Sequence, residues 1–444
     1  MKIGVAAAVL VLLSGAVRAD GPLSLGEAMG RARDGAREVT AAKARQEAAA
    51  SRARQATAFR LPSLNVSETY IRTDSPAESF ALELNRKEFS FPNFVQSDPN
   101  EPGWSGTAIT RFEAMVPLFT GGELSGRIDQ ARSAADAATS QASWAADTAA
   151  LAAGEAWVML AQAEEYVGLL TKARDTVAAH VALAKSYVEQ GMLVRSELLR
   201  AEVELARVED LLEDAKGKVR IANANLAFRI GVDQGSAWQL APLGPPKALD
   251  GDAAAWVASA GSARRDLAAA RSLLRAGELE EQVKKAGWWP KVGVMARWDL
   301  HDKNLFGASG SAGTLMAFAS VNVFQGGADK AAAAAARAEA EAGRQDVARF
   351  AEGVALEVRQ AYEEAATARA RHATAVKALE AARESERITD ERFRSGVVKT
   401  IDLLDAATAR REAETRELVA RADAHATALR LAVKSGKAPE TAAP

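Results

Sequence analysis

The sequence predicts a mainly α-helical protein with a small β part, built as long helical hairpins joined to four strands. Three observations support this fold class. Two very long stretches lack internal proline, from Pro117 to Pro242 and from Pro290 to Pro439, and are rich in good helix formers. Runs that alternate between apolar and polar residues flank the starts of these stretches. Short motifs also occur twice at a constant spacing, which indicates a duplicated unit.

Residues 1–19 have the pattern of a secretory signal peptide. A cationic start at Lys2 is followed by the apolar run Val5–Leu13 and then by small residues up to Ala19. A permanent membrane helix needs ~20 apolar residues, so this run is too short for one. An uncleaved anchor or a buried helix is the alternative. No cysteine follows the run, so no lipid anchor is expected.

The duplication is visible in two motifs. The segment 116–122 recurs at 321–327, and the sequence after Gly191 recurs after Gly396, both at an offset of 205 residues. Upstream, the prolines that end the first helix of each copy are offset by 228, so 228 − 205 = 23 residues are inserted in the first copy. We expect them in a long loop at residues 73–106. The predicted divisions are a signal peptide at 1–19, a first structural repeat at 20–250, a second repeat at 251–436 and a flexible tail at 437–444.

Each copy is predicted to begin with a helix and to end with much longer ones. In the first copy a capping box at Ser24–Glu27 opens a helix that runs to about Arg60, where Pro62 stops it. After two strands, residues 123–189 are predicted to form a helix of ~100 Å. The next helix carries apolar residues in a seven-residue repeat, typical of a helix paired with another. These residues are Leu198, Leu205, Leu212, Val219 and Leu226, with Ala201, Val208, Ala215 and Ala222 as the second seam. Helices alone would also fit an ordinary coiled-coil rod.

The strands distinguish this chain from a simple rod. Around Val116 and Val294, one face of each predicted strand is apolar and the other carries charges, at a period of two residues. Each run has about the length of a membrane-spanning strand. Aromatic residues near the strand ends would suit the membrane interface. They are Phe59, Tyr70, Phe119, Trp288, Trp289 and Phe324. Soluble hairpins with one face on a core are the alternative.

Four strands cannot close a barrel, because the smallest barrels have about eight. An open sheet in lipid would leave edge groups unpaired at several kcal/mol each. If these strands enter a membrane, chains must therefore share a barrel, and three chains would supply 3 × 4 = 12 strands. The long helices of the same chains would form a second, helical tube around the same axis.

No catalytic or cofactor chemistry is expected. Lys and Arg number 56 against 58 for Asp and Glu, which argues against a nucleic-acid binder. Cysteine is absent, and the four histidines have no ligand spacing. We find no phosphate-binding loop or nucleophile elbow. The sequence therefore predicts a protein that is not an enzyme and holds no metal or cofactor.

The sequence resembles the TolC-type outer-membrane efflux protein (outer-membrane factor) family. The resemblance rests on the duplicated unit of proline, strand, loop, strand, Gly-Gly and long helix, and on the motifs at 190–199 and 395–406. It covers essentially the whole mature chain. It implies a trimer with a 12-stranded transmembrane β-barrel continued by a periplasmic α-helical barrel, and residues 73–106 and 301–312 as cell-surface loops. Val398 stands where some members have an arginine, so a gate latch through that arginine is not expected here.

The resemblance also implies three groups of site residues. The periplasmic gate would contain Asp402, Asp405 and Glu197. The tip that docks an adaptor would contain Gly191, Met192, Leu193, Val194, Arg195, Ser196, Gly396, Val397, Val398, Lys399 and Thr400. The transition from barrel to helices would contain Pro62, Gly121, Gly122, Pro290, Gly326 and Gly327.

The predicted function is a passive trimeric channel in the outer membrane of a Gram-negative bacterium, with most of the chain in the periplasm. It would conduct substrates from an inner-membrane transporter and a periplasmic adaptor, in efflux or in type I secretion. The expected partners are two further copies of the chain, the adaptor, the transporter and outer-membrane lipid, with no nucleic acid. The alternative is a periplasmic structural or adaptor-like coiled-coil protein without a pore.

Overall fold

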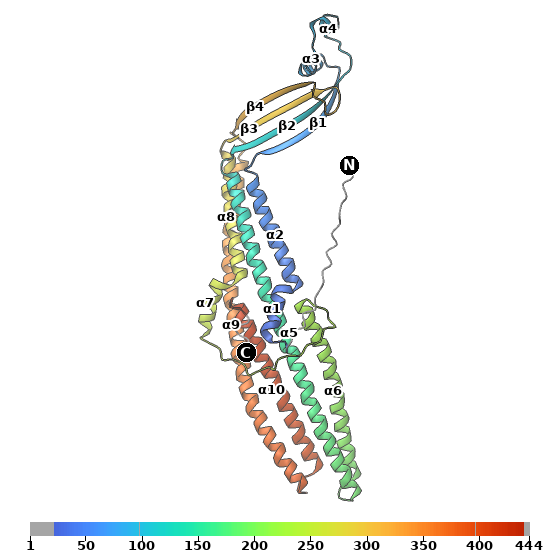
Figure 1. Ribbon diagram of the computed structural model, residues 1–444. Helices are drawn as coiled ribbons and strands as arrows, with labels where there is room; N and C mark the ends of the chain where they lie inside the picture. The colour runs from blue at the N-terminus through green and yellow to red at the C-terminus, as the bar shows by residue number, and fades with distance from the viewer. Residues whose placement is uncertain (1–21, 97, 396, 439–444) are drawn as a thin grey trace. The chain divides into compact units, whose positions relative to one another are not determined.

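The computed structural model describes residues 22–96, 98–395 and 397–438 (Figure 1). The predicted signal peptide, Gly396 and most of the predicted C-terminal tail lie outside these residues. The described elements occur in the order α1 (Leu25–Gly35), α2 (Arg37–Ala58), β1 (Ser63–Thr73), α3 (Pro76–Asn85), α4 (Phe91–Gln96), β2 (Ser105–Phe119), α5 (Glu123–Glu189), α6 (Arg195–Ile230), α7 (Ala253–Ala263), α8 (Arg265–Lys285), the short 3-10 helix η1 (Ala286–Trp288), β3 (Lys291–Asp302), β4 (Gly310–Ser320), α9 (Ala328–Arg394) and α10 (Thr400–Lys434).

The chain forms two compact units. Among the described residues, unit 1 combines 22–40, 145–264, 354–395 and 397–438, and unit 2 combines 41–96, 98–144 and 265–353. Each unit therefore takes segments from both halves of the sequence. The repeat boundaries at 20–250 and 251–436 stay predictions. None of the described helices is long and apolar enough to cross a bilayer.

Unit 2 contains one antiparallel sheet in the order β1-β2-β3-β4. Its register puts Val116 opposite Val294 and Met115 opposite Met295. Side chains directly opposite each other lie on the same face of a sheet, and neighbours along a strand lie on opposite faces. The two valines therefore share one face and the two methionines share the other, as the alternating pattern predicts. The predicted mainly helical fold with four strands is confirmed.

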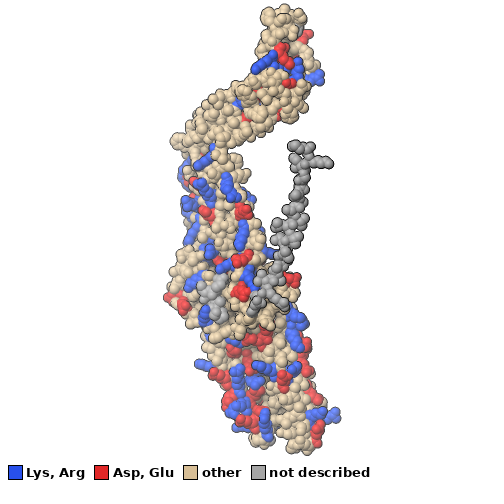
Figure 2. Space-filling model, in the orientation of Figure 1, with Lys and Arg blue, Asp and Glu red and all other residues tan. Residues whose placement is uncertain are grey.

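The two faces of this sheet differ in chemistry. The apolar face contains Leu64, Val66, Phe112, Ala114, Val116, Val294, Ala296, Trp298, Leu315 and Ala317. On the opposite face Asp299 accepts from the Arg111 guanidinium, with Nε and Oδ1 2.9 Å apart, and also pairs with Arg297 at 3.2 Å. Figure 2 shows few Lys, Arg, Asp or Glu side chains over the strands on the visible face, whereas the helices carry both signs of charge.

The helices of unit 2 are linked by side-chain contacts in the same order as the strands. Gln46 on α2 donates to Thr139 on α5 at 3.3 Å. Arg127 on α5 pairs with Glu280 on α8 at 3.2 Å. Arg337 on α9 pairs with Glu281 on α8 at 2.7 Å. The resulting order is α2-α5-α8-α9.

The insertion at residues 73–106 is more ordered than the predicted loop. It contains α3 and α4, whose phenylalanines Phe80 and Phe94 lie 5.5 Å apart between ring centroids. Arg86, only 4% exposed, contacts Thr107 at the start of β2 and Glu88. The predicted bounds of the second loop, 301–312, are wrong at both ends, because β3 runs to Asp302 and β4 begins at Gly310. The connection is residues 303–309.

Unit 1 contains helices α6 and α10 and the C-terminal parts of α5 and α9, which form the two long hairpins α5–α6 and α9–α10 (Figure 1). Helix α5 begins at Glu123 and ends at Glu189, as predicted, and both α5 and α9 have 67 residues. The second seam of the predicted seven-residue pattern in α6 is buried throughout, at Ala201, Val208, Ala215 and Ala222.

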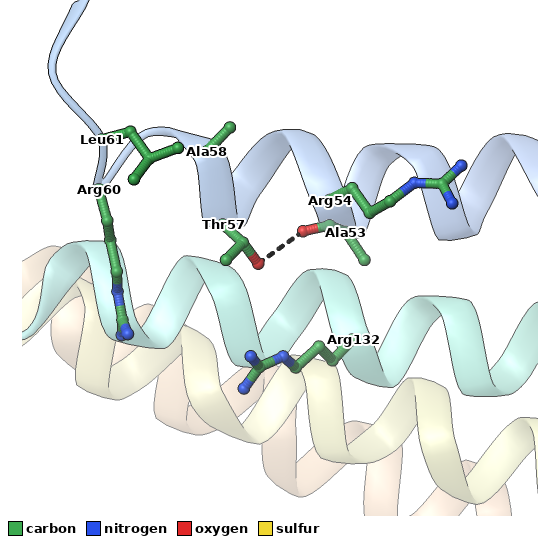
Figure 3. Close-up of a pocket in the computed structure, with 7 residues that line it drawn as sticks. All are labelled: Ala53, Arg54, Thr57, Ala58, Arg60, Leu61 and Arg132. Carbon is green, nitrogen blue, oxygen red and sulfur yellow. Dashed lines mark hydrogen bonds between the residues drawn. The ribbon is translucent and has the colours of Figure 1, made fainter.

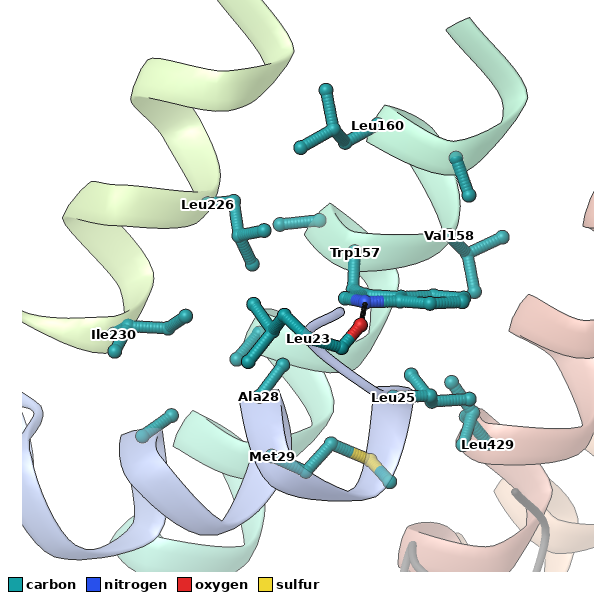
Figure 4. Packing of buried hydrophobic residues seen from close by; sticks show 14 of the residues in the cluster. Leu23, Leu25, Ala28, Met29, Trp157, Val158, Leu160, Leu226, Ile230 and Leu429 are labelled. Carbon is teal, nitrogen blue, oxygen red and sulfur yellow. Dashed lines mark hydrogen bonds between the residues drawn. The ribbon is translucent and has the colours of Figure 1, made fainter. Parts of the chain in front are cut away.

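The largest core of unit 1 surrounds Trp157 of α5, which is 1% exposed (Figure 4). Leu23 and Met29 reach it from the N-terminal segment, Leu226 from α6 and Leu429 from α10. The indole Nε1 donates to the carbonyl oxygen of Leu23 at 2.9 Å. This bond satisfies the only polar atom of a buried tryptophan. The core therefore ties the segment around Leu23 and Met29 to both hairpins.

One predicted helix is divided. The helix expected from Ser24 to about Arg60 is broken at Ala36, whose φ of −59° and ψ of 139° are not helical. Half of the predicted capping box is present, since Ser24 Oγ accepts from the Glu27 amide at 3.2 Å, whereas the Glu27 carboxylate pairs with Arg31. The break lies where Gly231 ends α6 with a φ of +85°, and a Cβ on Gly231 would come within 2.8 Å of the Gly35 oxygen. The C-terminal end of α6 therefore lies close to the backbone at the point where the predicted helix is interrupted.

Candidate functional site: the ends of the long hairpins

The first hairpin turns immediately after α5. Gly191 has a φ of +74°, in the left-handed region that glycine adopts without strain. The Met192 and Leu193 amides both donate to the Tyr187 oxygen, at 2.8 and 3.2 Å, and so satisfy the end of α5. Val194 is the N-cap residue of α6. Arg195 and Ser196 form the exposed first turn of α6.

The second hairpin turns between α9 and α10. The Val397 amide donates to the Arg392 oxygen at 3.0 Å, and Lys399 is the N-cap residue of α10. Gly396 lies outside the described residues. Val397 is 72% exposed and Val194 of the first turn is 65% exposed. Each hairpin turn therefore contains an exposed valine. In the second turn, Val398 follows directly after it.

The ends of the two hairpins lie together within unit 1. The rings of Tyr187, at the end of α5, and Phe393, at the end of α9, have centroids 6.2 Å apart. Phe393 is 6% exposed, so this contact is part of the packing. The structure thus brings the two sequence-predicted tip segments to one end of the unit.

The three predicted gate carboxylates have different surroundings. Asp402 Oδ2 accepts from the Lys399 amide at 2.9 Å, which satisfies one of the free amides at the start of α10. Asp402 and Asp405 are both exposed in the single chain. Glu197 pairs with Arg200 at 3.4 Å, and its second oxygen is buried without a hydrogen-bond partner. Asp402 therefore has a local role as a helix cap, in addition to any role in a channel.

Sequence reasoning missed a set of ion pairs that link α10 to its neighbours. Arg411 pairs with Glu204 of α6 at 2.9 Å, with side-chain exposures of 10% and 15%. Arg410 pairs with Glu386 of α9 at 2.7 Å. The signal was present: at the 205-residue offset, Arg410 takes the position of Leu205 in the apolar seam of α6. A charge at a seam position indicates a charged partner across the helices.

Burial near these pairs shifts the titration of two groups. Burial raises the pKa of Glu386, and nearby Arg410 acts in the opposite direction. Burial lowers the pKa of His180 on α5, and nearby Asp390 opposes the shift. Among the described residues, no group of three or more His, Asp or Glu side chains is placed to hold a metal ion.

The predicted transition residues lie where helices meet strands. Pro62 directly precedes β1, and Pro290 directly precedes β3. The two Gly-Gly pairs precede α5 and α9, and all four of these glycines have a positive φ: Gly121 +66°, Gly122 +92°, Gly326 +63° and Gly327 +83°. Each Gly-Gly turn therefore has the same handedness. A Cβ on Gly121 would lie 2.6 Å from the Ala286 oxygen, so glycine is required there on steric grounds as well.

Comparison with known proteins identifies the family. The sequence model of the family described as "Outer membrane efflux protein" matches residues 28–232 and 256–437, which is most of the chain. The chain belongs to the outer membrane efflux protein family. The resemblance to TolC-type proteins seen in the duplicated unit is thereby confirmed.

Comparison with individual proteins shows how far the likeness extends. Protein CyaE of Bordetella pertussis is 28% identical over 280 residues, which span 61% of this chain but only 58% of that protein. The outer membrane protein VceC of Vibrio cholerae has the same fold, with a TM-score of 0.75 and 18% identity over 93% of this chain and 96% of that chain. The open state of the MtrE outer membrane channel of Neisseria gonorrhoeae matches with a TM-score of 0.76 and 17% identity over 93% and 89% of the two chains.

Proposed function

We propose that three copies of this chain form a passive channel in the outer membrane of a Gram-negative bacterium. The observation that carries the proposal is the sheet, which has one apolar face and an order in which β1 and β4 pair on one side only. In lipid, unpaired strand edges cost several kcal/mol per group, so such a sheet is stable only when its edges are closed by other chains. Membership of the outer membrane efflux protein family supports the same role.

Three chains would close the barrel with 3 × 4 = 12 strands. The first strand of one copy would pair with the last strand of the next, and the helical order α2-α5-α8-α9 would continue around the ring. The long hairpins would then extend the channel into the periplasm. Substrates would arrive from an inner-membrane transporter through a periplasmic adaptor, in efflux or type I secretion, so that energy coupling belongs to those partners.

The channel proposal is tested by placing charge on either face of the sheet. Val294→Arg puts a cation on the apolar face and should block insertion, because arginine at the bilayer midplane costs about 2–4 kcal/mol per chain. Met295→Arg, one residue along and on the opposite face, is the matched control and should be tolerated. The measurement is the amount of heat-modifiable, SDS-resistant trimer in isolated outer membranes. Equal tolerance at both positions would refute the membrane sheet.

The same fractionation separates the proposal from a periplasmic rod without a pore. A channel sediments with the outer membrane and shows conductance in planar bilayers. A structural or adaptor-like protein would appear in the soluble periplasmic fraction without forming an SDS-resistant trimer. The exposed apolar face of the sheet favours the channel.

We further propose that the two hairpin turns dock the adaptor. Their exposed valines, Val194 and Val397, offer apolar contacts at adjacent ends of the hairpins. The chain has no cysteine, so Val194→Cys and Val398→Cys introduce unique crosslinking positions. Crosslinks to the adaptor are expected from these positions and not from Glu352→Cys, which lies on exposed surface of α9 within unit 2. Capture only from the control position would refute tip docking.

Asp402 and Asp405 are proposed to line the narrow end of the channel. They lie three residues apart, on one side of α10, and both are exposed. Three chains would contribute 3 × 2 = 6 carboxylates, whose combined field favours cations and binds multivalent ones. Replacing both with Asn should weaken cation selectivity and relieve block by trivalent cations in planar bilayers. Because Asp402 also caps α10, Asp405→Asn alone is the cleaner variant, and unchanged selectivity in an assembled Asp405→Asn trimer would refute the assignment.

A further inference from the structure

An open groove of about 500 Å³ lies between α2 and α5 in unit 2 (Figure 3). Most of its lining surface is apolar, but three arginines border it. The lining residues are Ala53, Arg54, Thr57, Ala58, Arg60, Leu61 and Arg132. Thr57 Oγ1 donates to the Ala53 carbonyl of its own helix at 2.9 Å, which leaves no free hydroxyl donor in the groove. The groove therefore combines an apolar floor with cationic side chains.

The three arginines extend in different directions, and only Arg60 crosses the gap between the helices. In Figure 3 the side chain of Arg60 extends from the end of α2 toward α5, and that of Arg132 extends below Thr57, whereas Arg54 points along α2 away from the gap. Arg60 is held across the gap by a hydrogen bond from its Nη2 to Ser125 Oγ, at 3.1 Å. Arg132 has only a solvent-exposed pair with Asp129, at 3.3 Å. Among the described residues, no carboxylate lies within ion-pair distance of Arg60. Its positive charge is therefore not neutralised by the protein.

The groove lies next to the start of the sheet. Arg60 follows the last residue of α2 by two positions and precedes the first residue of β1 by three. The neighbouring side chains Phe59, Leu61 and Leu64 are 63%, 65% and 73% exposed. Exposed aromatic and aliphatic residues beside arginines are typical of the boundary between hydrocarbon and lipid headgroups. If the sheet spans the outer membrane, as proposed above, the groove lies at the periplasmic headgroup layer.

We propose that this groove binds an anionic phospholipid, with the phosphodiester between Arg60 and Arg132 and the start of an acyl chain along Ala58 and Leu61. Planar guanidinium groups bind phosphate oxygens through paired hydrogen bonds. A zwitterionic lipid also carries a phosphate, but its cationic headgroup reduces the net attraction to the arginines. A second copy of the chain is a poorer occupant. It would join at the free edge of β1, whereas this groove lies on the side of α2 that faces α5, within one chain.

The test compares lipids on the purified oligomer. Protein in detergent micelles is titrated with dioleoyl phosphatidylglycerol or dioleoyl phosphatidylcholine, and the lipids retained per chain are counted by native mass spectrometry. The wild-type protein should retain phosphatidylglycerol about tenfold more tightly, because both lipids offer the phosphodiester but the quaternary ammonium of phosphatidylcholine is repelled by the two guanidinium groups. The variant Arg60→Gln, Arg132→Gln should bind both lipids equally. The control Arg45→Gln, Arg52→Gln removes two exposed arginines of α2 outside the groove and should behave as wild type.

Other outcomes separate the possible explanations. The variant Arg60→Lys, Arg132→Lys keeps both positive charges and serves as the test if the Gln pair fails to assemble. It should show an intermediate preference for phosphatidylglycerol. Displacement of the lipid by inorganic phosphate, but not by sodium chloride of equal ionic strength, would show a site for free phosphate and overturn the proposal. So would equal retention of the two lipids by wild type, or an unchanged preference in the Gln pair. Absence of the wild-type protein from the outer membrane would instead refute the channel proposal, whereas the lipid preference is measured in micelles and is read separately.

Discussion

The two long hairpins are related by the sequence repeat but differ in their contacts at equivalent positions. In α5–α6, the contact is an apolar seam in which Leu170 packs against Leu212 and Val177 packs against Val208. In α9–α10, the position equivalent to Leu212 is Glu417, which contacts His372 of α9 at 3.1 Å. Apolar packing contributes in proportion to the buried area, whereas a polar contact exchanges hydrogen bonds with water and contributes less. The second hairpin is therefore polar where the first is apolar, although Val358 of α9 belongs to the same apolar cluster as Leu431 of α10.

The largest expected effect comes from the apolar hairpin. Leu212→Ala removes a side chain that is 4% exposed and should destabilise α5–α6 by about 2–4 kcal/mol, through lost burial and the cavity left behind. The equivalent change in the other hairpin, Glu417→Ala, should cost about 1 kcal/mol, because it removes a hydrogen-bond contact with His372 and a pair with Arg421, which keeps Glu165 as a partner. Hydrogen exchange of the two hairpins measures both effects. Equal costs at the two positions would remove the distinction between the hairpins.

A slightly smaller effect is expected where the charged hairpin contacts the apolar one. Arg411→Ala leaves the largely buried Glu204 with only Arg207, at 3.7 Å, as a cationic partner and should cost about 2 kcal/mol, below the range for a buried charge left without any partner. Replacing both residues with Leu should restore most of the stability, since no charge is then left unpaired. Thermal unfolding of the two variants and of Glu204→Leu forms a double-mutant cycle. A double variant as unstable as Arg411→Ala would argue against an electrostatic cause.

The smallest effect is a loss of stability in mild acid. Burial lowers the pKa of His425 on α10, although the hydrogen bond to the Gly244 oxygen raises it; Arg421, His372 and Arg369 face the same ring and add to the lowering. Nε2 lies 2.8 Å from a carbonyl oxygen, which can only accept, so the neutral ring carries its proton there. An unfolded histidine binds a proton below pH ~6.5 and the buried one does not, so this contribution is complete above that pH and is lost as pH falls.

The pH effect has a built-in comparison between the hairpins. The loss should not exceed ~1.4 kcal/mol per pH unit for one proton. His425→Gln should reduce the dependence of stability on pH for α10. His180→Gln should do the same for α5, where burial also lowers the pKa of the histidine. Glu386 acts in the opposite direction, since its raised pKa lets the folded state bind a proton that the unfolded state has released. Thermal unfolding between pH 7.5 and 5.5, chosen as about one unit either side of the histidine pKa, provides the measurement. A slope that is unchanged in both variants would exclude these histidines as its cause.

Local patterns were enough to predict most elements, because helices and strands depend on neighbouring residues. The span of α5, the seam at Ala201 and Val208, and the two faces around Val294 all follow from periodicity. The failures involve distant contacts. The break at Ala36 lies beside the end of α6, and Arg86 is buried against β2, so neither feature is encoded by adjacent residues. The partner of Arg411 lies 207 residues away, which no local pattern specifies.

The two copies of the sequence repeat also share an equivalent hydrogen bond. The Trp157 indole Nε1 donates to the Leu23 carbonyl oxygen, and the hydroxyl of its equivalent Tyr362 donates to the Gly251 carbonyl oxygen. The two rings are offset by 205 residues and the two acceptors by 228, the same two spacings seen in the motifs. A bond that anchors the start of each copy is thus present twice, although the surrounding cores differ. Two copies can therefore diverge in the chemistry of their seams while they keep the contact that positions their first segment.

The open edges of the sheet have a consequence for how the chain reaches its final state. Strands β1 and β4 each have 11 residues, and alternate residues direct their backbone groups away from the sheet, where no strand among the described residues pairs with them. Such edges pair readily with any exposed strand, including that of an incorrect neighbour. Correct pairing is intermolecular, so its rate rises with the concentration of chains, whereas the helical hairpins form within one chain. Folding is therefore expected to proceed with the helices first and the strands last, and dilution should prolong the interval in which a chain can aggregate.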